Sequence, residues 1–287
     1  MTRQFAILLS ILLGLLGGAA QAAGTPAGYV VAIALAGEDA SARTAVVRQG
    51  KELPPKLMMP LYDGDVVFLR DAASRIGVEL GNGKTMEVGG DVARYDVKGK
   101  IDTGDDAWSI LTAIGNVLSG DQDEIPQNMV ARGDPASIDV AMAVHGANYI
   151  VRGNRLLWLS WSGGTGPYAL TVSADGVDLK LPPAAGPQAE VPLSAVKGDL
   201  VIVTIRDAAA GAAIVRLRLR DAAPALPDKV KNAAPGQSAG TLVAAAWLVA
   251  RDKGAWTIEA AQALHARGGA DQAATALLAQ LARGWKP

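Results

Sequence analysis

The stretch that decides the fold of this chain is IGVELGNGKTMEV, residues 76–88. Apolar side chains alternate with other residues up to Asn82 and Gly83, and they alternate again on the far side of this pair. An Asn-Gly pair between two alternating runs is the strongest short-range signal of a β-hairpin. We therefore predict two antiparallel strands joined by a tight turn here.

Further short β-rich runs surround this hairpin. Residues 29–35, 45–47 and 66–69 are rich in Val, Ile and Ala and show no helical spacing. The turn residues of 63–65, Asp-Gly-Asp, come directly before the last of these runs. Residues 23–100 are therefore predicted to form a compact β domain.

Helical periodicity replaces the alternating pattern over residues 103–119. Apolar side chains recur there at three- and four-residue steps, and Asp105 and Asp106 stand where they favour a helix N-terminus. The following residues are polar and rich in turn formers. We therefore predict a helix and a linker within residues 101–134.

Strand patterns return over residues 135–221. The apolar residues of 138–144 alternate strictly, and several short β-rich runs follow. Roughly seven strands at this spacing predict an immunoglobulin-like sandwich. We expect antiparallel pairing, because no helix intervenes to carry a parallel crossover.

The C-terminal part is predicted to contain a Pro/Ala linker, residues 222–240, and a small helical cluster, residues 241–287. We expect Ser238 and Thr257 to cap two of its three short helices. The expected interior of the cluster is Trp247, Trp256, Leu264, Leu277 and Leu281. The alternative is a surface that docks a partner, with Trp247 and Trp256 as its contact residues.

The expected fold class is therefore mainly β. It consists of two β domains, a connecting helix and a small C-terminal α-helical cluster.

The N-terminal residues 1–22 have the three parts of a cleaved signal peptide. Arg3 supplies the positive charge, residues 5–16 form a short apolar run, and Ala20-Gln21-Ala22 provides small residues around a cleavage point before Ala23. A retained membrane anchor is the alternative, but a spanning helix needs about 20 apolar residues. We expect export to the periplasm, or release beyond it, without stable membrane insertion.

Composition excludes several classes of function. The chain has 0 Cys, so it has no disulfides, thiol nucleophiles or lipid-modified cysteine. Its 27 Lys and Arg residues nearly balance 28 Asp and Glu residues. Such a mixed charge argues against nucleic acid and anionic membrane as principal partners.

Catalytic signatures are not found in the sequence. The two histidines, His145 and His265, fall in different predicted domains, and no nucleophile elbow, phosphate loop, zinc-protease motif or dinucleotide fingerprint occurs. The acidic clusters at residues 102–106 and 121–124 do not keep the ligand order of a calcium-binding EF-hand. We predict a non-enzymatic protein with no catalytic, cofactor-binding or metal-binding residues; an uncharacterised hydrolase remains the alternative.

The most distinctive segment is WLSWSGGTGPY, residues 158–168. Trp161 and Tyr168 could form a stacking platform, because exposed aromatic faces bind sugars or peptides well. We favour a structural interpretation, in which Trp158 is the buried tryptophan of the sandwich and the glycines form a tight hairpin. Strand alternation places Leu157 and Leu159 on the same face as Trp161, so one face can be core and the other partly exposed.

Four motifs of the first predicted domain resemble the FecR-like periplasmic domain. They are GYVV (28–31), VVR (46–48), LYDGDVV (61–67) and VELGNG (78–83). The resemblance implies a β domain that opens with a strand, carries Gly-Asp before its central strand and then forms a hairpin. The best-known relatives have an N-terminal membrane segment linked to a sigma-factor system, and this chain departs from that plan.

The leading hypothesis is an exported, periplasmic binding or scaffold protein of a FecR-like type. It would act through contacts with an envelope protein partner in an envelope or signalling assembly. The alternative from a different class is a carbohydrate-binding module that uses Trp161 and Tyr168.

Overall fold

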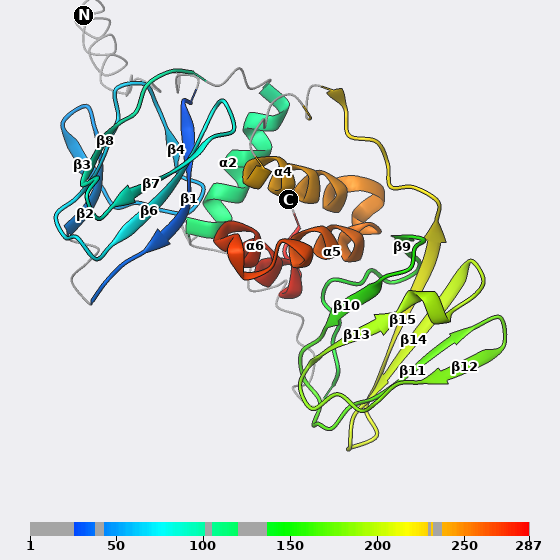
Figure 1. The fold of residues 1–287 in the computed structure, drawn as a ribbon. Helices are drawn as coiled ribbons and strands as arrows, with labels where there is room; N and C mark the ends of the chain where they lie inside the picture. The colour runs from blue at the N-terminus through cyan, green and yellow to red at the C-terminus, as the bar shows by residue number, and fades with distance from the viewer. Residues whose placement is uncertain are drawn as a thin grey trace, which may run out of the picture.

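The computed structural model describes residues 26–37, 43–100, 105–119, 137–228, 231 and 237–286. The predicted signal peptide at residues 1–22 and the predicted linker stretch at 121–134 lie outside the described residues. The chain is mainly β, which confirms that part of the predicted fold class. Two β units lie on either side of a group of helices (Figure 1).

The first β unit packs two antiparallel sheets, of strand order β4-β1-β6-β7 and β3-β2-β5-β8, against each other. Its strands are β1 (Gly28–Ala34), β2 (Thr44–Arg48), β3 (Lys51–Leu53), β4 (Pro60–Leu61), β5 (Val66–Leu69), β6 (Arg75–Leu80), β7 (Thr85–Gly89) and β8 (Arg94–Asp96). Small β-branched side chains from both sheets, such as Val30 and Val67, fill the interior.

The predicted hairpin is confirmed as β6 and β7, which pair antiparallel from Glu79 opposite Thr85. Gly83 has a φ of +76°, a backbone conformation that side-chain-bearing residues rarely adopt. The Asn82 side chain accepts a hydrogen bond from the Lys84 N–H at 3.0 Å. Both residues of the Asn-Gly pair therefore contribute directly to the turn.

Strand β1 is buried on both faces. Val30 points into the interior of the first β unit, whereas Tyr29 and Val31 belong to a second core that includes the helices. This explains the continuous apolar run in the sequence, since a strand covered on both sides does not alternate.

The second β unit packs a five-stranded sheet of order β12-β11-β14-β15-β9 against the pair β10-β13. The strands are β9 (Asn148–Val151), β10 (Leu156–Ser160), β11 (Ala169–Ala174), β12 (Val177–Lys180), β13 (Gln188–Pro192), β14 (Leu200–Arg206) and β15 (Ala212–Arg220). The expectation of wholly antiparallel pairing is wrong, because β9 and β15 pair in parallel. They are the first and last strands of the unit, so the intervening strands form the crossover without a helix.

The strand predicted at residues 138–144 is also wrong. The segment forms an isolated bridge between Asp139 and Ser162, and then a turn in which the Ala143 N–H donates to the Val140 carbonyl. Met142 is nevertheless fully buried. The alternating pattern therefore reflects which side chains are buried, and it occurs here without the continuous hydrogen bonding of a β-strand.

The described helices are α2 (Asp105–Ser119), α4 (Gln237–Ala250), α5 (Thr257–Arg267) and α6 (Gln272–Ala282). Helix α2 confirms the predicted apolar face through the buried Leu111 and Ile114. In the described part of the chain, no helix combines the length and hydrophobicity needed to cross a membrane.

The C-terminal helices lie between the two β units (Figure 1). Helices α4 and α6 contact α2 and β1, and α5 contacts β9 and β10. A single buried cluster runs from Tyr29 in the first unit through Leu277 in α6 to Ile150 in the second unit. The helical cluster is therefore packed against the rest of its own chain.

Buried polar contacts attach the helices to the first β unit. The Glu79 carboxylate, at 3% exposure, accepts hydrogen bonds from the N–H groups of Ser238 at 3.0 Å and Ala239 at 3.1 Å. The Ser238 hydroxyl donates to Asp271, which caps α6 by accepting from the Ala274 N–H. The prediction that Ser238 caps its helix is wrong, because the N–H groups at the N-terminus of α4 donate to the Glu79 carboxylate from β6.

Thr257 does not cap its helix either. It is the first residue of α5, Trp256 occupies the N-cap position, and the Thr257 hydroxyl donates to the Gly254 carbonyl at 2.7 Å. The hydroxyl thus binds the chain that enters the helix instead of the helix N–H groups.

Helix α5 is attached to the second β unit by two side chains. Gln262 accepts from the Trp158 N–H and donates to the Trp158 carbonyl, both at 2.8 Å. Glu259 accepts from the Val151 N–H at 3.1 Å and forms an ion pair with Arg155. The Gln262 amide therefore satisfies the free edge of β10 as a neighbouring strand would.

Candidate functional site

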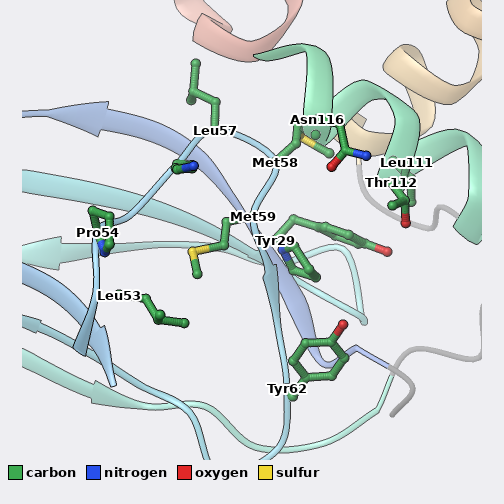
Figure 2. Close-up of a pocket in the computed structure, with 13 residues that line it drawn as sticks. Tyr29, Leu53, Pro54, Leu57, Met58, Met59, Tyr62, Leu111, Thr112 and Asn116 are labelled. Carbon is green, nitrogen blue, oxygen red and sulfur yellow. The ribbon is translucent and has the colours of Figure 1, made fainter. Parts of the chain in front are cut away.

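An apolar cavity of about 490 Å³ lies between the first β unit and α2 (Figure 2). Most of its lining is Leu, Met, Pro or Tyr, and it comprises Tyr29, Leu53, Pro54, Lys56, Leu57, Met58, Met59, Pro60, Tyr62, Leu111, Thr112, Gly115 and Asn116. Its volume is in the range of pockets that receive ligands. The cavity is therefore the candidate binding site.

The wall between β3 and β4 is an irregular segment attached to β1. The Met58 N–H donates to the Val30 carbonyl at 2.7 Å, and the Val30 N–H donates to the Met59 carbonyl at 3.1 Å. Met58 has a φ of +59°, which is uncommon for a residue with a side chain. This conformation places Met58 in the core and leaves Met59 partly exposed beside the cavity.

Helix α2 approaches this segment closely at Gly115. A Cβ atom at that position would stand 3.3 Å from the Met58 carbonyl oxygen. The absence of a side chain therefore lets the helix backbone form the opposite wall. In Figure 2, Thr112 and Asn116 extend from this helix beside the cavity.

The rim at Tyr62 is held by a buried carboxylate. Asp65 is 2% exposed, and both of its oxygens accept hydrogen bonds from Arg48, the shortest at 2.7 Å. The same carboxylate accepts from the Tyr62 N–H at 2.9 Å, and the Arg48 guanidinium lies 4.4 Å from the centre of the Tyr62 ring. The LYDGD stretch therefore positions one edge of the cavity.

Both tyrosines stay neutral over the physiological pH range. Burial, with a smaller contribution from Tyr62, raises the pKa of Tyr29 well above its ordinary value. Burial also raises the pKa of Tyr62, and the nearby Arg48 opposes this shift in part. The cavity thus offers aromatic rings and neutral hydroxyls, with Lys56 as the charged residue of its described lining.

This site was not identified from the sequence. The chain between Leu53 and Pro60 reads PPKLMM, an apolar loop without strand or helix periodicity. An apolar run in a loop is a usable signal, because loops are ordinarily polar. The α2 wall could not be assigned from sequence, since more than fifty positions separate Met58 from Leu111.

The predicted site residues Trp161 and Tyr168 belong to the core of the second β unit. They are 5% and 6% exposed, and their rings pack edge to face at 5.1 Å. The Tyr168 hydroxyl donates to the Gly163 carbonyl at 3.0 Å. A stacking platform requires an exposed ring face, so the carbohydrate-binding interpretation is corrected here.

The face assignment of β10 is confirmed, but the identity of its buried tryptophan is not. Leu157 and Leu159 are fully buried on the face shared with Trp161, whereas Trp158 is only partly buried. Trp158 stacks on the His265 ring at 5.0 Å, outside the sandwich. The presence of α5 on this side explains why Trp158 is covered at all.

Trp247 and Trp256 are buried within the chain, at 8% and 4% exposure. Trp256 donates through its indole N–H to Asp252 and packs against Tyr149 of β9, while the Arg251 guanidinium lies over Trp247. Their predicted burial is confirmed, with Trp256 placed where the helices meet β9. The alternative, in which they form a partner-docking surface, is corrected, because neither ring is available at the surface.

The histidines lie in different surroundings. His265 is on α5 beside Trp158, with Nε2 4.0 Å from a Glu190 oxygen, and His145 is exposed before β9. Across the described residues, no group of three or more His, Asp or Glu side chains is arranged to hold a metal ion.

Comparisons with protein-family models, curated proteins and solved structures find no match to this chain. The resemblance of the first β unit to FecR-like domains therefore stays a prediction.

Proposed function

We propose that this protein is a non-enzymatic binding protein of the cell envelope, and that its apolar cavity receives a short apolar segment of a partner protein. The proposal retains an exported, periplasmic location, a FecR-like character for the first β unit and an immunoglobulin-like character for the second. The observation that carries it is the cavity of about 490 Å³ between the first β unit and α2.

The chemistry of the lining favours a protein partner. Met58 and Met59 supply flexible, polarisable thioethers, which adapt to apolar side chains of different shapes. Tyr29 and Tyr62 add large rings with neutral hydroxyls, a combination that is enriched at protein interfaces. Interfaces concentrate their binding energy where apolar anchors enter such pockets.

The position of the cavity also favours binding over catalysis. Its walls are joined to fixed elements, through the Val30 backbone on one side and α2 on the other. The Arg48–Asp65 pair orients the rim at Tyr62 instead of facing a reacting group. The described residues therefore form a shaped apolar receptor.

The first test uses N-phenylnaphthylamine, a neutral apolar fluorophore, with the full chain. Thr112 is exposed at the cavity wall, so Thr112→Trp should fill the opening and weaken dye binding at least tenfold without disturbing the core. The matched control is Val177→Trp, at an exposed strand position in the other β unit, which should change binding less than twofold. If the native protein and both variants bind the dye equally, the cavity is not the binding site and the proposal is wrong.

The second test identifies the partner. A photo-crosslinking residue at Thr112 should capture an envelope protein that the same residue at Val177 does not capture. The captured protein, once purified, should bind the native chain and lose at least tenfold in affinity with Thr112→Trp. Binding that is unaffected by this variant would contradict the proposal, and capture of a small apolar molecule alone would replace the protein partner by a ligand.

A further inference from the structure

A second cavity, of about 440 Å³, lies between β15, the segment before β9 and the turn after α6. Its charged lining is mainly basic, with Arg216 from β15, Arg283 and Lys286 from the C-terminal turn, and Asp139 as the acidic member. His145 also lines the cavity. Two segments that are distant in sequence, β15 and the C-terminal turn, therefore bring cations to one cavity.

The basic side chains in this cavity have no partners among the described residues. Arg216, Arg283 and Lys286 are exposed, and none of their side chains forms an ion pair or hydrogen bond within the described chain. By contrast, Arg48 and Arg155 each pair with a carboxylate. The lining holds three basic side chains and one acidic side chain, Asp139, so the basic groups repel one another and an anion in the cavity would relieve that repulsion.

The cavity walls are held in place by a buried amide. Asn148 is fully buried, accepts from the Val144 N–H at 2.9 Å and donates to the Arg216 carbonyl at 3.1 Å. This side chain joins the segment before β9 to the strand that carries Arg216. On the other side, Gly284 packs against Ala141, and this contact holds the C-terminal turn against the segment before β9.

The remaining lining is apolar. Val140, Ala141 and Val144 form one wall, and Ile214, which is 53% exposed, lies at another. A ligand that fills this space would therefore combine a negative group with a short hydrocarbon part. The volume is suitable for a small organic molecule.

We infer that this cavity binds a small organic anion, a carboxylate or phosphate ester with a short apolar part, through Arg216, Arg283 and Lys286. Guanidinium groups match the planar or tetrahedral oxygens of these anions in paired hydrogen bonds. The inference does not depend on the apolar cavity next to α2, because the two cavities share no lining residue.

The test is calorimetric titration of the full chain with hexanoate, hexyl phosphate and hexanol. One saturable site is expected for at least one anion. The anion with the higher affinity shows whether the site prefers a carboxylate or a phosphate. Hexanol should bind at least tenfold more weakly, and added salt should weaken anion binding. No saturable binding of either anion, or equal binding of hexanol, would overturn the inference.

Variants locate the site. Arg216→Gln and Arg283→Gln should each weaken anion binding at least fivefold, because each removes a charged hydrogen-bond donor from the cavity. Arg218→Gln is the matched control, since Arg218 is exposed on the same face of β15 but does not line the cavity, and it should change affinity less than twofold. All three side chains are exposed, so unchanged thermal unfolding is expected; an equal loss with Arg218→Gln would overturn the location.

Discussion

Glu79 shows how one buried carboxylate can connect two parts of this chain. It projects from β6, an interior strand of its sheet, and accepts hydrogen bonds from two N–H groups at the N-terminus of α4. A negative charge is favourable at that end of a helix. Burial has the larger effect and raises the pKa of Glu79 above the ordinary 4.5. The nearby negative charge of Asp271 adds a small further increase.

This shift predicts a pH dependence of stability. A raised pKa means that the folded chain binds the proton more tightly than the unfolded chain does. The contribution of Glu79 is therefore fully present below pH 4.5 and is lost as the pH rises through the raised pKa. Urea unfolding over a series of pH values should show this loss in the native protein and not in Glu79→Gln.

The control for this experiment is Glu87→Gln on the neighbouring strand, where the side chain is 69% exposed. It should keep the pH dependence of the native protein. If Glu79→Gln also keeps it, then the dependence arises elsewhere and the role assigned to Glu79 is wrong.

At the scale of single elements, α5 substitutes for a missing strand. Strand β10 pairs with β13 on one edge. On its other edge, the Gln262 side-chain amide forms hydrogen bonds with the N–H and the carbonyl of Trp158. Gln262 is itself 7% exposed. A helix can therefore close a sheet edge through one well-placed amide, which also protects that edge from pairing with another chain.

Removal of this amide should destabilise the protein measurably. Gln262→Ala leaves the Trp158 N–H and carbonyl without their partner, and unsatisfied buried groups cost about 2–4 kcal/mol in total. His265→Ala, one turn along the same helix, removes only a ring stacked on Trp158 at the surface and should cost less than about 1 kcal/mol. Chemical denaturation of the two variants distinguishes them, and equal losses would argue against the strand-like role of Gln262.

The helices themselves follow from local patterns, but the contacts that attach α4 and α5 to the β units do not. The apolar periodicity of α2 and the small residues that separate α5 from α6 are visible in the sequence. The partner of Ser238 is 159 residues away, and the partner of Trp158 is 104 residues away. No local pattern can predict such contacts, because they exist only once the helices have packed between the β units.

At the scale of the whole molecule, the C-terminal helices make one continuous core of the two β units. The buried cluster that contains Leu277 includes Tyr29 and Val31 from the first unit and Ile150 and Leu157 from the second. A smaller cluster, with Val30 and Val67, belongs to the first unit alone. Loosening the helices should therefore affect both units together.

Leu277→Ala tests this coupling. Leu277 is fully buried, so its truncation should lower the free energy of unfolding by about 2–5 kcal/mol. Hydrogen exchange of the full chain should show faster exchange in both β1 and β9. Leu278→Ala, at the next and only partly buried position, should have a smaller effect. Loss of protection in one β unit alone would show that the two units unfold independently.

The sequence by itself determined the elements whose signals are local: the hairpin at Asn82-Gly83, the strand-rich character of both units and the helix after residue 103. Only the tertiary structure decided the parallel pairing of β9 with β15, the burial of Trp161 and Tyr168, and both cavities. The physical reason is the range of the interactions. Periodicity and turn chemistry act over a few residues, whereas cavities and sheet edges depend on which distant surfaces meet.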